Sequence, residues 1–355
     1  MTTQTEPTGA GEPTEAGEPT GAGQPTEAGG REPAGPTRRR PSRPVTITLW
    51  LVVAGFAVWA AVRGFGLESG FPFIQLISFT PYVAAAAVLP LTAALVLRRW
   101  LAAVVAGLVT VTLAACVLPR TFSDGGALPA GPTLRVLTAN MLVGGADAAG
   151  IVALVRDNHV DLLALQEYTP EAERALAAAG LPALLPDRSA YPLEGVGGSA
   201  LYSRLPLHDD GVRLNPYEFG QAQATVTVPG AAPIAVESVH ATAPASSWVT
   251  DGWARSLAGE PPATGNGQVR VLLGDFNATL DHVALRRLLD TGYRDAADVT
   301  GDGFTMTWPY DKVFPSVALD HVLADRRVGV RRVVVHPVPG GDHRAVFAEL
   351  VLPPG

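Results

Sequence analysis

Three long runs without a charged residue fill most of the first third of the chain. They extend from Val45 to Val62, from Phe71 to Leu97 and from Trp100 to Leu118, with 18, 27 and 19 residues. A helix needs roughly 20 apolar residues to cross the hydrocarbon core of a bilayer. Three such runs in succession are rare in soluble folds. We therefore predict three membrane spans, at about 45–62, 71–97 and 100–118, rather than a buried helical hairpin.

The middle run contains three prolines, Pro72, Pro81 and Pro90. Proline is tolerated in membrane spans better than in soluble helices, because neighbouring groups can bond to the backbone that it frees. We therefore expect one helix here, kinked at a proline.

Arginines flank the runs unequally. Four arginines, at 38–40 and 43, precede the first run, and Arg98 and Arg99 separate the second from the third, whereas the other two connections carry only Arg63 and Arg120. Positive residues concentrate on the cytoplasmic side of membrane proteins. This pattern predicts a multi-pass protein of the cell membrane with a cytoplasmic N-terminus. Three spans then place the C-terminal part outside the cytoplasm, and a miscount of one span would reverse that side.

Two segments lack the pattern of a folded element. Residues 1–44 repeat a Gly-Glu/Gln-Pro-Thr unit and contain almost no large apolar side chains. Such a segment cannot offset its ordering entropy by burial, so we predict a disordered tail. Residues 119–132 are rich in glycine and proline and are predicted to be a linker.

Residues 133–355 have the pattern of a folded domain. The only cysteine is Cys116, so the domain must be stable without a disulfide. A domain of this length buries enough surface for that. Short apolar segments typical of strands occur at 134–140, 161–167, 199–203, 224–228, 234–240, 269–277, 319–324, 330–336 and 345–352. Helical patterns at 148–158, 171–180 and 281–289 fall between some of them, which indicates an α/β fold of stacked sheets.

Polar residues that could bind a metal or act in catalysis stand at the ends of these strands. They are Asn140, Glu167, His240, Asp275, Asn277, Asp320, Asp342 and His343. Strand ends at one edge of a sheet can converge on one cleft. A hard cation such as Mg²⁺ prefers carboxylate and phosphate oxygens, and histidine can exchange a proton near neutral pH. Together these residue types favour hydrolysis of a phosphate ester.

The same residues carry a family resemblance. The ordered segments TANM, LQE, GGSALYSR, VESVHA, LLGDFNAT, LDHVLA and GGDHRAVFAEL resemble those of the endonuclease/exonuclease/phosphatase superfamily, the deoxyribonuclease-I-like fold. The resemblance covers residues 133–353. It implies a four-layer α/β sandwich, with two central, mostly antiparallel sheets between outer helices.

The resemblance also implies roles for the matched residues. It implies that Asn140, Glu167 and Asp342 bind the metal, Mg²⁺ or Mn²⁺. The implied catalytic residues are Asp275 and Asn277, which orient the attacking water and contact the phosphate, His343 with its orienting carboxylate Asp320, and the strand-end residue His240. Arg204 follows the matched GGSALYS strand and is a candidate for substrate binding.

Two positions depart from the family pattern. Gly341 replaces the usual serine before Asp342, and His321 stands where tyrosine or histidine is common. Neither change removes a charged functional group, so we expect an active enzyme. A non-catalytic binding or sensing module on the same fold is the alternative. Such a module would be expected to lack Glu167, Asp275 or His343, and this chain retains all three.

The charge balance bears on the substrate, which we expect to be a phosphodiester or phosphomonoester. From residue 133 onward the chain has 25 acidic and 17 basic residues, and Lys312 is its only lysine. Duplex DNA binding relies on lysine and arginine, so an extracytoplasmic nuclease is the less favoured alternative unless arginines such as Arg286, Arg287 and Arg294 form a stripe. The apolar runs favour a lipid or another ester near the bilayer. No sequence feature predicts a protein partner.

Overall fold

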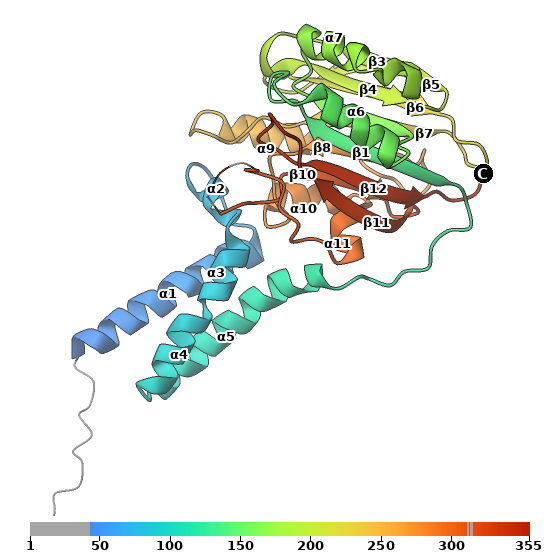
Figure 1. Ribbon diagram of the computed structural model, residues 1–355. Helices are drawn as coiled ribbons and strands as arrows, with labels where there is room; N and C mark the ends of the chain where they lie inside the picture. Colours follow the sequence, from blue (N-terminus) through green and yellow to red (C-terminus); the bar gives the residue numbers. More distant parts are fainter. Residues whose placement is uncertain (1–42, 311, 313–314) are drawn as a thin grey trace, which may run out of the picture. The chain divides into compact units, whose positions relative to one another are not determined.

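A computed structural model describes residues 43–310, 312 and 315–355. In this part of the chain, two six-stranded sheets form the centre of the C-terminal domain (Figure 1). The first has the order β11-β12-β1-β2-β4-β3, with strands Gly329–His336, Ala345–Val351, Thr133–Asn140, Leu162–Gln166, Ser199–Ser203 and Asp187–Tyr191. The second has the order β5-β6-β7-β8-β10-β9, with strands Leu207–Leu214, Gly220–Val226, Ile234–His240, Arg270–Asp275, Asp320–Asp325 and Tyr293–Asp295.

Each sheet contains one parallel pair at its centre. These pairs are β1 with β2 in the first sheet and β7 with β8 in the second, and the remaining neighbours are antiparallel. The strands of a parallel pair end at the same edge of the sheet. Each sheet therefore brings two strand ends together.

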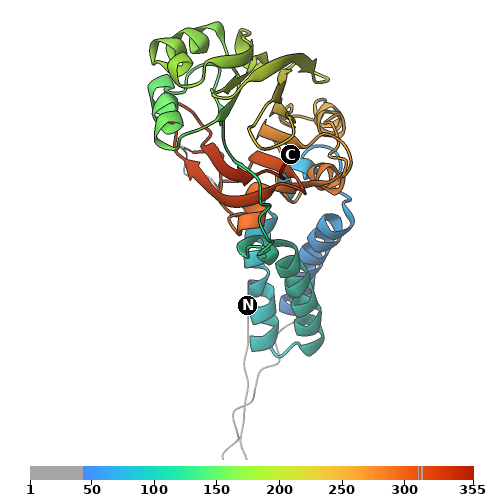
Figure 2. The same ribbon diagram turned by 90° about the vertical axis from the view of Figure 1, so that its right-hand side faces the viewer.

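Helices cover the outer faces of both sheets. The first sheet carries α6 (Ala148–Asp157), α7 (Pro170–Ala178) and α8 (Leu181–Leu184), and the second carries α9 (Thr250–Ala258) and α10 (Val283–Asp290). Figure 2 shows α6 and α7 on the side of the domain away from α9 and α10. The short helices η2 (Gly195–Gly197) and α11 (Ala296–Thr300) lie in connections. This is the four-layer sandwich that the sequence predicts.

Alternating side chains hold the layers together. Along β1, Leu134 and Val136 belong to the core between the sheets, whereas Leu137 and Ala139 pack under the outer helices. Successive strand residues point to opposite faces, so a strand that is covered on both sides reads as a continuous apolar run. The most apolar strands were therefore visible in the sequence. The sequence did not predict three strands, β3, β5 and β9, because they are exposed or short and lack such an apolar run. It also did not predict helix α9.

The prediction of three spanning helices is wrong for the middle run. Two helices are long and apolar enough to cross a membrane, Arg43–Phe65 (α1) and Trp100–Thr121, which consists of α5 (Trp100–Val117) and the turn η1 (Leu118–Thr121). The run 71–97 instead forms three short helices, α2 (Phe73–Ile77), α3 (Thr80–Ala86) and α4 (Val88–Val96). Its three prolines account for the breaks, because proline lacks a backbone N–H and disfavours a helical residue before it.

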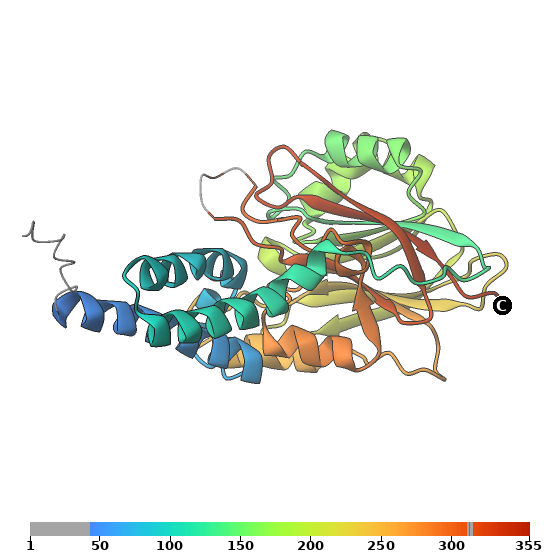
Figure 3. The same cartoon turned by 90° about the horizontal axis from the view of Figure 1, so that it is seen from below.

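The two long helices keep most of their large side chains outward. Leu51 and Val58 on α1 and Leu101, Leu108 and Val111 on α5 are more than 60% exposed. Small residues meet in the contacts between the helices, including Ala94 of α4 and Ala102, Ala103 and Ala106 of α5. Figure 3 shows α4 and α5 side by side. Helices with this distribution are not the core of a soluble fold.

A buried ion-pair group joins both long helices to the domain. The carboxylate of Asp281, ahead of α10, accepts hydrogen bonds from Arg63 Nε at 2.6 Å and from Arg120 Nη1 and Nη2 at 2.9 and 2.6 Å. All three side chains are at most 10% exposed. Since Arg63 lies near the end of α1 and Arg120 just after α5, one carboxylate holds the same end of both helices. The two helices therefore run in the same direction.

The other predicted segments are placed as follows. Residues 1–42 of the predicted tail lie outside the described residues, and Arg43 and Pro44 belong to α1. Residues 119–132 connect α5 to β1 without a strand or α-helix. They are nevertheless attached to the domain, through Arg120 and through an ion pair between Asp124 and Arg294.

Replacing Asp281 by asparagine tests the attachment of the helices. Removing one partner from a buried ion pair leaves uncompensated charge, here two arginines, at a cost of about 3–5 kcal/mol. We expect Asp281→Asn to lower the free energy of unfolding by that amount, measured by chemical unfolding of the detergent-solubilised full chain. Asp290→Asn, at an exposed aspartate at the end of α10, is the matched control. Equal stability of the two variants would contradict the role of Asp281.

Candidate active site

The two parallel pairs bring four of the predicted residues to one edge of the sandwich. In the first sheet, Asn140 at the end of β1 is level with Gln166, and Glu167 follows directly. In the second, His240 at the end of β7 is level with Asp275 at the end of β8. The two sheets face each other, so the four side chains meet between them.

Two further residues enter from neighbouring antiparallel strands. Asp320 begins β10 and pairs with Asp275. His343 lies two residues before β12, which runs antiparallel to β1. An antiparallel strand begins where its neighbour ends, so its first residues reach the same edge.

Two site residues have left-handed backbone conformations. Glu167 has φ of 54° and Asn277 has φ of 46°. Strict alternation along β2 would place Glu167 on the helix-covered face, together with Leu163 and Leu165. The left-handed turn ends the strand and lets the carboxylate reach the cleft. Such a conformation costs about 1–2 kcal/mol outside glycine and recurs at functional sites.

The glycine of the GDFN segment is required by packing. A Cβ at Gly274, where φ is 152°, would lie 1.9 Å from the carbonyl oxygen of Val239. The absence of a side chain lets β8 approach β7 closely. This approach sets the position of Asp275, the next residue.

The Asn140 amide lies between two carboxylates. Its Nδ2 donates to Glu167 Oε1 and to Asp275 Oδ2, each at 3.2 Å, and its Oδ1 accepts from the backbone N–H of Leu142 at 2.9 Å. Glu167 Oε2 accepts from the backbone N–H of Val143 at 2.8 Å. The amide donor therefore occupies a position to which both carboxylates direct negative charge.

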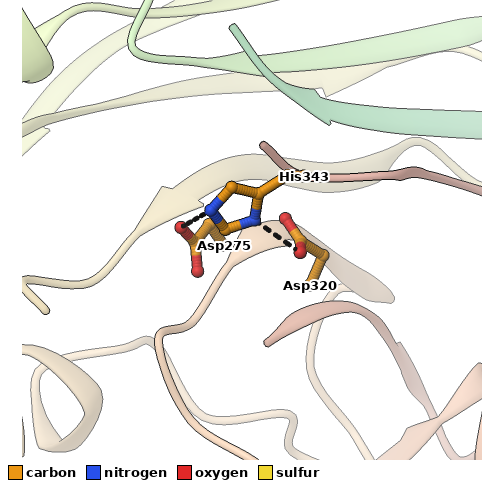
Figure 4. A group of neighbouring side chains, drawn as sticks. All are labelled: Asp275, Asp320 and His343. Atoms are coloured by element: carbon orange, nitrogen blue, oxygen red, sulfur yellow. Dashed lines mark hydrogen bonds and ion pairs between the residues drawn. The ribbon is translucent and has the colours of Figure 1, made fainter. Parts of the chain in front are cut away.

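His343 lies between Asp320 and Asp275 (Figure 4). Its Nδ1 is 2.8 Å from Asp320 Oδ2, a hydrogen bond, and its Nε2 is 3.7 Å from Asp275 Oδ2. Burial alone would lower the pKa of His343, but the charges of Asp320 and Asp275 outweigh it and raise the pKa to about 10. The imidazole is therefore a cation at neutral pH.

The neighbouring acids and His240 respond chiefly to burial. Burial raises the pKa of Asp275 to about 6, against the lowering effect of His343, and it raises the pKa of Glu167. His240 Nε2 lies 3.9 Å from Glu167 Oε1 and 4.0 Å from Asp275 Oδ2. Burial nevertheless lowers the pKa of His240. The site thus contains one cationic and one neutral histidine.

The remaining predicted residues differ in position. Asp342 lies at the site, where its Oδ2 accepts from Trp308 Nε1 at 3.1 Å and its Oδ1 is 4.0 Å from His343 Nε2. Asn277 donates through Nδ2 to the carbonyl of Ala241 at 2.9 Å and lines the cavity. Arg204 is at the other end of β4, next to Asp161, so the structure does not bring it to the site.

The oxygen donors fit a hard divalent cation. Glu167 and Asp275 are held close together without a lysine or arginine partner among their described contacts. Asp275, Asp320 and His343 form a second possible group, whose ligand atoms lie within 4.8 Å of one another. Asp320 Oδ1 is buried and has no hydrogen-bond partner among the described residues. Either group could hold a metal ion.

Several supporting residues were missed by the sequence reasoning. Gln166 of β2 donates to Ser238 Oγ of β7 at 2.9 Å and so links the two sheets below the site. Gln221 accepts from the backbone N–H of His240, and Thr307 accepts from that of Asp320. The glutamine between Leu165 and Glu167 was the one available signal, because a buried amide needs partners.

A cavity of about 620 Å³ opens at these residues. Its polar lining consists of Gln75, Ser78, Glu167, His240, Thr242, Asp275, Asn277 and His343. The rest is Phe79, Val196, Phe219, Ala243, Pro244, Ala245, Trp308, Val317 and Leu319. Among the described residues that line it, none is lysine or arginine. Three lining residues, Gln75, Ser78 and Phe79, belong to the segment between the two long helices.

Comparison with known proteins agrees with this geometry. The model of the endonuclease/exonuclease/phosphatase family matches residues 137–343, which is more than half of the chain. No curated protein is significantly similar in sequence. TDP2 from Caenorhabditis elegans has a similar structure, with a TM-score of 0.50 at 15% identity over 67% of this chain and 79% of that one.

Two bacterial structures are also similar. An endonuclease/exonuclease/phosphatase protein from Beutenbergia cavernae has a TM-score of 0.49 at 19% identity, over 62% of this chain and 72% of that one. A mannosyl-6-phosphatase from Bacteroides thetaiotaomicron has a TM-score of 0.46 at 15% identity, over 62% of this chain and all of that one.

Replacing Asn140 by aspartate tests the arrangement of charges. The change removes the donor to Glu167 and Asp275 and adds a third carboxylate, and like charges in a buried site repel strongly. We expect Asn140→Asp to lower the thermal midpoint in EDTA and Mg²⁺ to restore much of the loss, measured by thermal unfolding. Asn266→Asp, at an exposed loop residue, is the control and should not respond to Mg²⁺. Equal midpoints for Asn140→Asp with EDTA and with Mg²⁺ would argue against a cation at this position.

Proposed function

Because the chain belongs to the endonuclease/exonuclease/phosphatase family, we propose that it is a divalent-metal-dependent phosphoesterase that acts at a membrane. The reaction would be attack of an activated water on the phosphorus of a phosphodiester or phosphomonoester. The observation that carries the proposal is the convergence of Asn140, Glu167, Asp275, Asp320 and His343 on one buried edge of the sandwich.

Asp275 and Asn277 are the residues proposed to orient the water. Asp275 Oδ1 accepts from the backbone N–H of Asn277 at 2.8 Å, which fixes the carboxylate, and Asn277 donates its side chain to Ala241. A carboxylate whose pKa lies near neutrality is suited to accept a proton from water. Both side chains line the cavity, where water and substrate have access.

His343 is proposed to stabilise the phosphate charge. Its hydrogen bond to Asp320 holds the ring in place, and its Nε2 faces Asp275 across the cavity edge. A fixed cation in a poorly solvated site stabilises negative charge that develops in the transition state. His240, which is neutral, would donate or accept a hydrogen bond on the other side of Asp275.

The metal is proposed to be Mg²⁺ or Mn²⁺, held by Glu167, Asn140 and Asp342 with access to Asp275. When bound, it would neutralise phosphate oxygens and lower the pKa of a coordinated water. The Asp275, Asp320 and His343 group is a less favourable position. There the imidazolium already offsets the two carboxylates, and Mg²⁺ prefers oxygen to nitrogen ligands.

The lining of the cavity bears on the alternative of a nuclease. A protein that grips nucleic acid draws affinity from arginine and lysine on phosphates. The described cavity lining contains neither. Of the arginines considered for a basic stripe, Arg294 pairs with Asp124 and Arg286 donates to backbone carbonyls, including that of Arg63. These contacts favour a smaller or less charged ester. A non-catalytic module would not need the intact set of acids.

The direction of the helices supports the proposed membrane topology. Since the ends of α1 and α5 both reach Asp281, the segment with α3 and α4 runs back between them. If α1 and α5 cross the bilayer in the same direction, the domain lies on the side opposite the N-terminus. Arg63 and Arg120 contact Asp281 at the domain end of the long helices, whereas Arg43, Arg98 and Arg99 lie at the opposite end, which is the end proposed to be cytoplasmic.

Hydrolysis of bis-p-nitrophenyl phosphate by the detergent-solubilised full chain tests the proposed function. We expect turnover with Mg²⁺ or Mn²⁺ that EDTA abolishes. His343→Ala should lower kcat/KM by about 10²–10³-fold, the usual cost of removing one group that stabilises transition-state charge.

The matched control for this experiment is His208→Ala. His208 is an exposed histidine on β5 that pairs with Asp210, and its replacement should leave kcat/KM unchanged. Full activity of folded His343→Ala would contradict the assignment. Undiminished activity in EDTA would contradict the metal requirement.

Cysteine labelling in intact cells tests the topology. In a Cys116→Ser background, we expect a cysteine at the exposed position Asp290 to react with a membrane-impermeant maleimide. A cysteine at Ala28, ahead of α1, should react only after permeabilisation. Labelling is measured by the mass shift of the purified chain. The reverse pattern would place the domain in the cytoplasm.

A further inference from the structure

The cavity combines the catalytic groups with a larger apolar lining. Beside Glu167, Asp275 and His343 it is bounded by aromatic and aliphatic side chains such as Phe79, Phe219, Val317 and Leu319. About 620 Å³ is within the range of pockets that enclose drug-sized ligands, and it is far more than a phosphate group needs. The remaining space is bounded by groups that favour hydrocarbon over water.

One wall of the cavity belongs to the segment between the long apolar helices. Gln75 of α2 donates through Nε2 to the carbonyl of Pro244, and His282 Nε2 donates to the carbonyl of Ile74 at 2.9 Å. Ile74 is 5% exposed and packs in the core below α9 and α10. These contacts hold the segment against the domain. Phe79, four residues after Gln75, lines the cavity from this segment.

Exposed apolar side chains continue outward from this wall. Leu67, Phe71 and Phe73 are 62, 49 and 61% exposed. They precede Gln75 on the chain and follow α1, one of the helices long enough to cross a membrane. The loop that contributes Thr242 to Ala245 to the lining, and that accepts the hydrogen bond from Gln75, carries Trp248, which is 81% exposed. Aromatic side chains of this kind favour the interface between lipid and water.

We propose that the substrate is an amphiphilic phosphate ester of lipid type. Its apolar chain occupies the part of the cavity between the α2–α3 segment and the 242–245 loop, while its phosphate lies at Asp275 and His343. The described lining offers a polyanion no lysine or arginine, and it agrees with a ligand whose only charge is the ester itself. This inference rests on the proposed phosphoesterase function and adds the substrate class.

The test compares two esters that differ only in the apolar chain. Ethyl p-nitrophenyl phosphate and octyl p-nitrophenyl phosphate have the same leaving group and charge. With the full chain in lipid nanodiscs and Mg²⁺, we expect kcat/KM for the octyl ester to exceed that for the ethyl ester by a factor on the order of 100. Each buried CH₂ contributes up to about four-fold, so six additional groups can supply this preference even when partly buried.

Two matched pairs of variants separate binding in the cavity from simple partitioning into lipid. Ala243→Trp fills the cavity from an exposed loop position, and Ala232→Trp adds the same side chain at an exposed position that does not line it. Phe79→Ala removes part of the wall, and Phe122→Ala removes an exposed phenylalanine that does not line the cavity. We expect Ala243→Trp and Phe79→Ala to lower the octyl-to-ethyl ratio at least ten-fold and their controls to keep it.

The outcomes distinguish the two levels of the proposal. Equal kcat/KM for the two esters in the unmodified protein would overturn the lipid substrate and leave the phosphoesterase intact. If Ala243→Trp and Ala232→Trp change the octyl-to-ethyl ratio equally, the lipid substrate is also overturned, because the preference for the octyl ester would then come from partitioning into the bilayer. Failure to hydrolyse either ester with Mg²⁺ or Mn²⁺ would overturn the proposed function together with the inference.

Discussion

The hydrogen bond from Gln166 to Ser238 holds the two sheets together directly below the site. Both side chains are fully buried, and Thr138 donates to the same glutamine. Ser238 in turn donates to the carbonyl of Leu165 in the opposite sheet at 3.0 Å. An unpaired amide in this core would cost about 1–3 kcal/mol, so a shift of one sheet against the other is opposed at this point. Asn140 and Glu167 can face His240 and Asp275 only when the two sheets keep this relative position.

The buried acids concentrate negative charge at the site. Six ionisable groups meet at the site, and in a poorly solvated space each carboxylate raises the cost of ionising the next. His343 supplies one positive charge and Asn140 supplies a partial one through its amide. Glu167 and Asp275 keep raised pKa values in spite of both. Folding therefore maintains a concentration of negative charge, which the proposed divalent ion would relieve.

The sequence predicted the sandwich and two of the apolar helices, and it was wrong on the middle run. It also showed which polar residues stand at the strand ends, but it contained no signal for the cavity. Strands covered on both faces appear as unbroken apolar runs, and their ends are marked by polar residues such as Asn140 and Asp275. These are local patterns. The exposed strand β5 and the three-residue strand β9 lack them. The position of Arg204 away from the cleft has a similar cause: it is fixed by the antiparallel pairing of β4 with β2, which motif order does not reveal. The prolines of the middle run were expected to kink one helix, but the run is divided into α2, α3 and α4.

Packing joins the apolar segments to the catalytic domain more closely than the pattern of the sequence suggests. Ile74 lies in the same core as Trp253 and Leu285, Arg63 and Arg120 share Asp281, and Gln75 holds the loop after His240. The predicted boundary at residue 133 marks a change in composition, but removing the residues before it would expose this core and open one wall of the cavity. A segment used only as an anchor would not need such contacts. The geometry instead makes the connection between α1 and α3 part of the cavity wall. The proposed attachment to a membrane and the proposed selection of a lipid-type ester would therefore depend on the same residues.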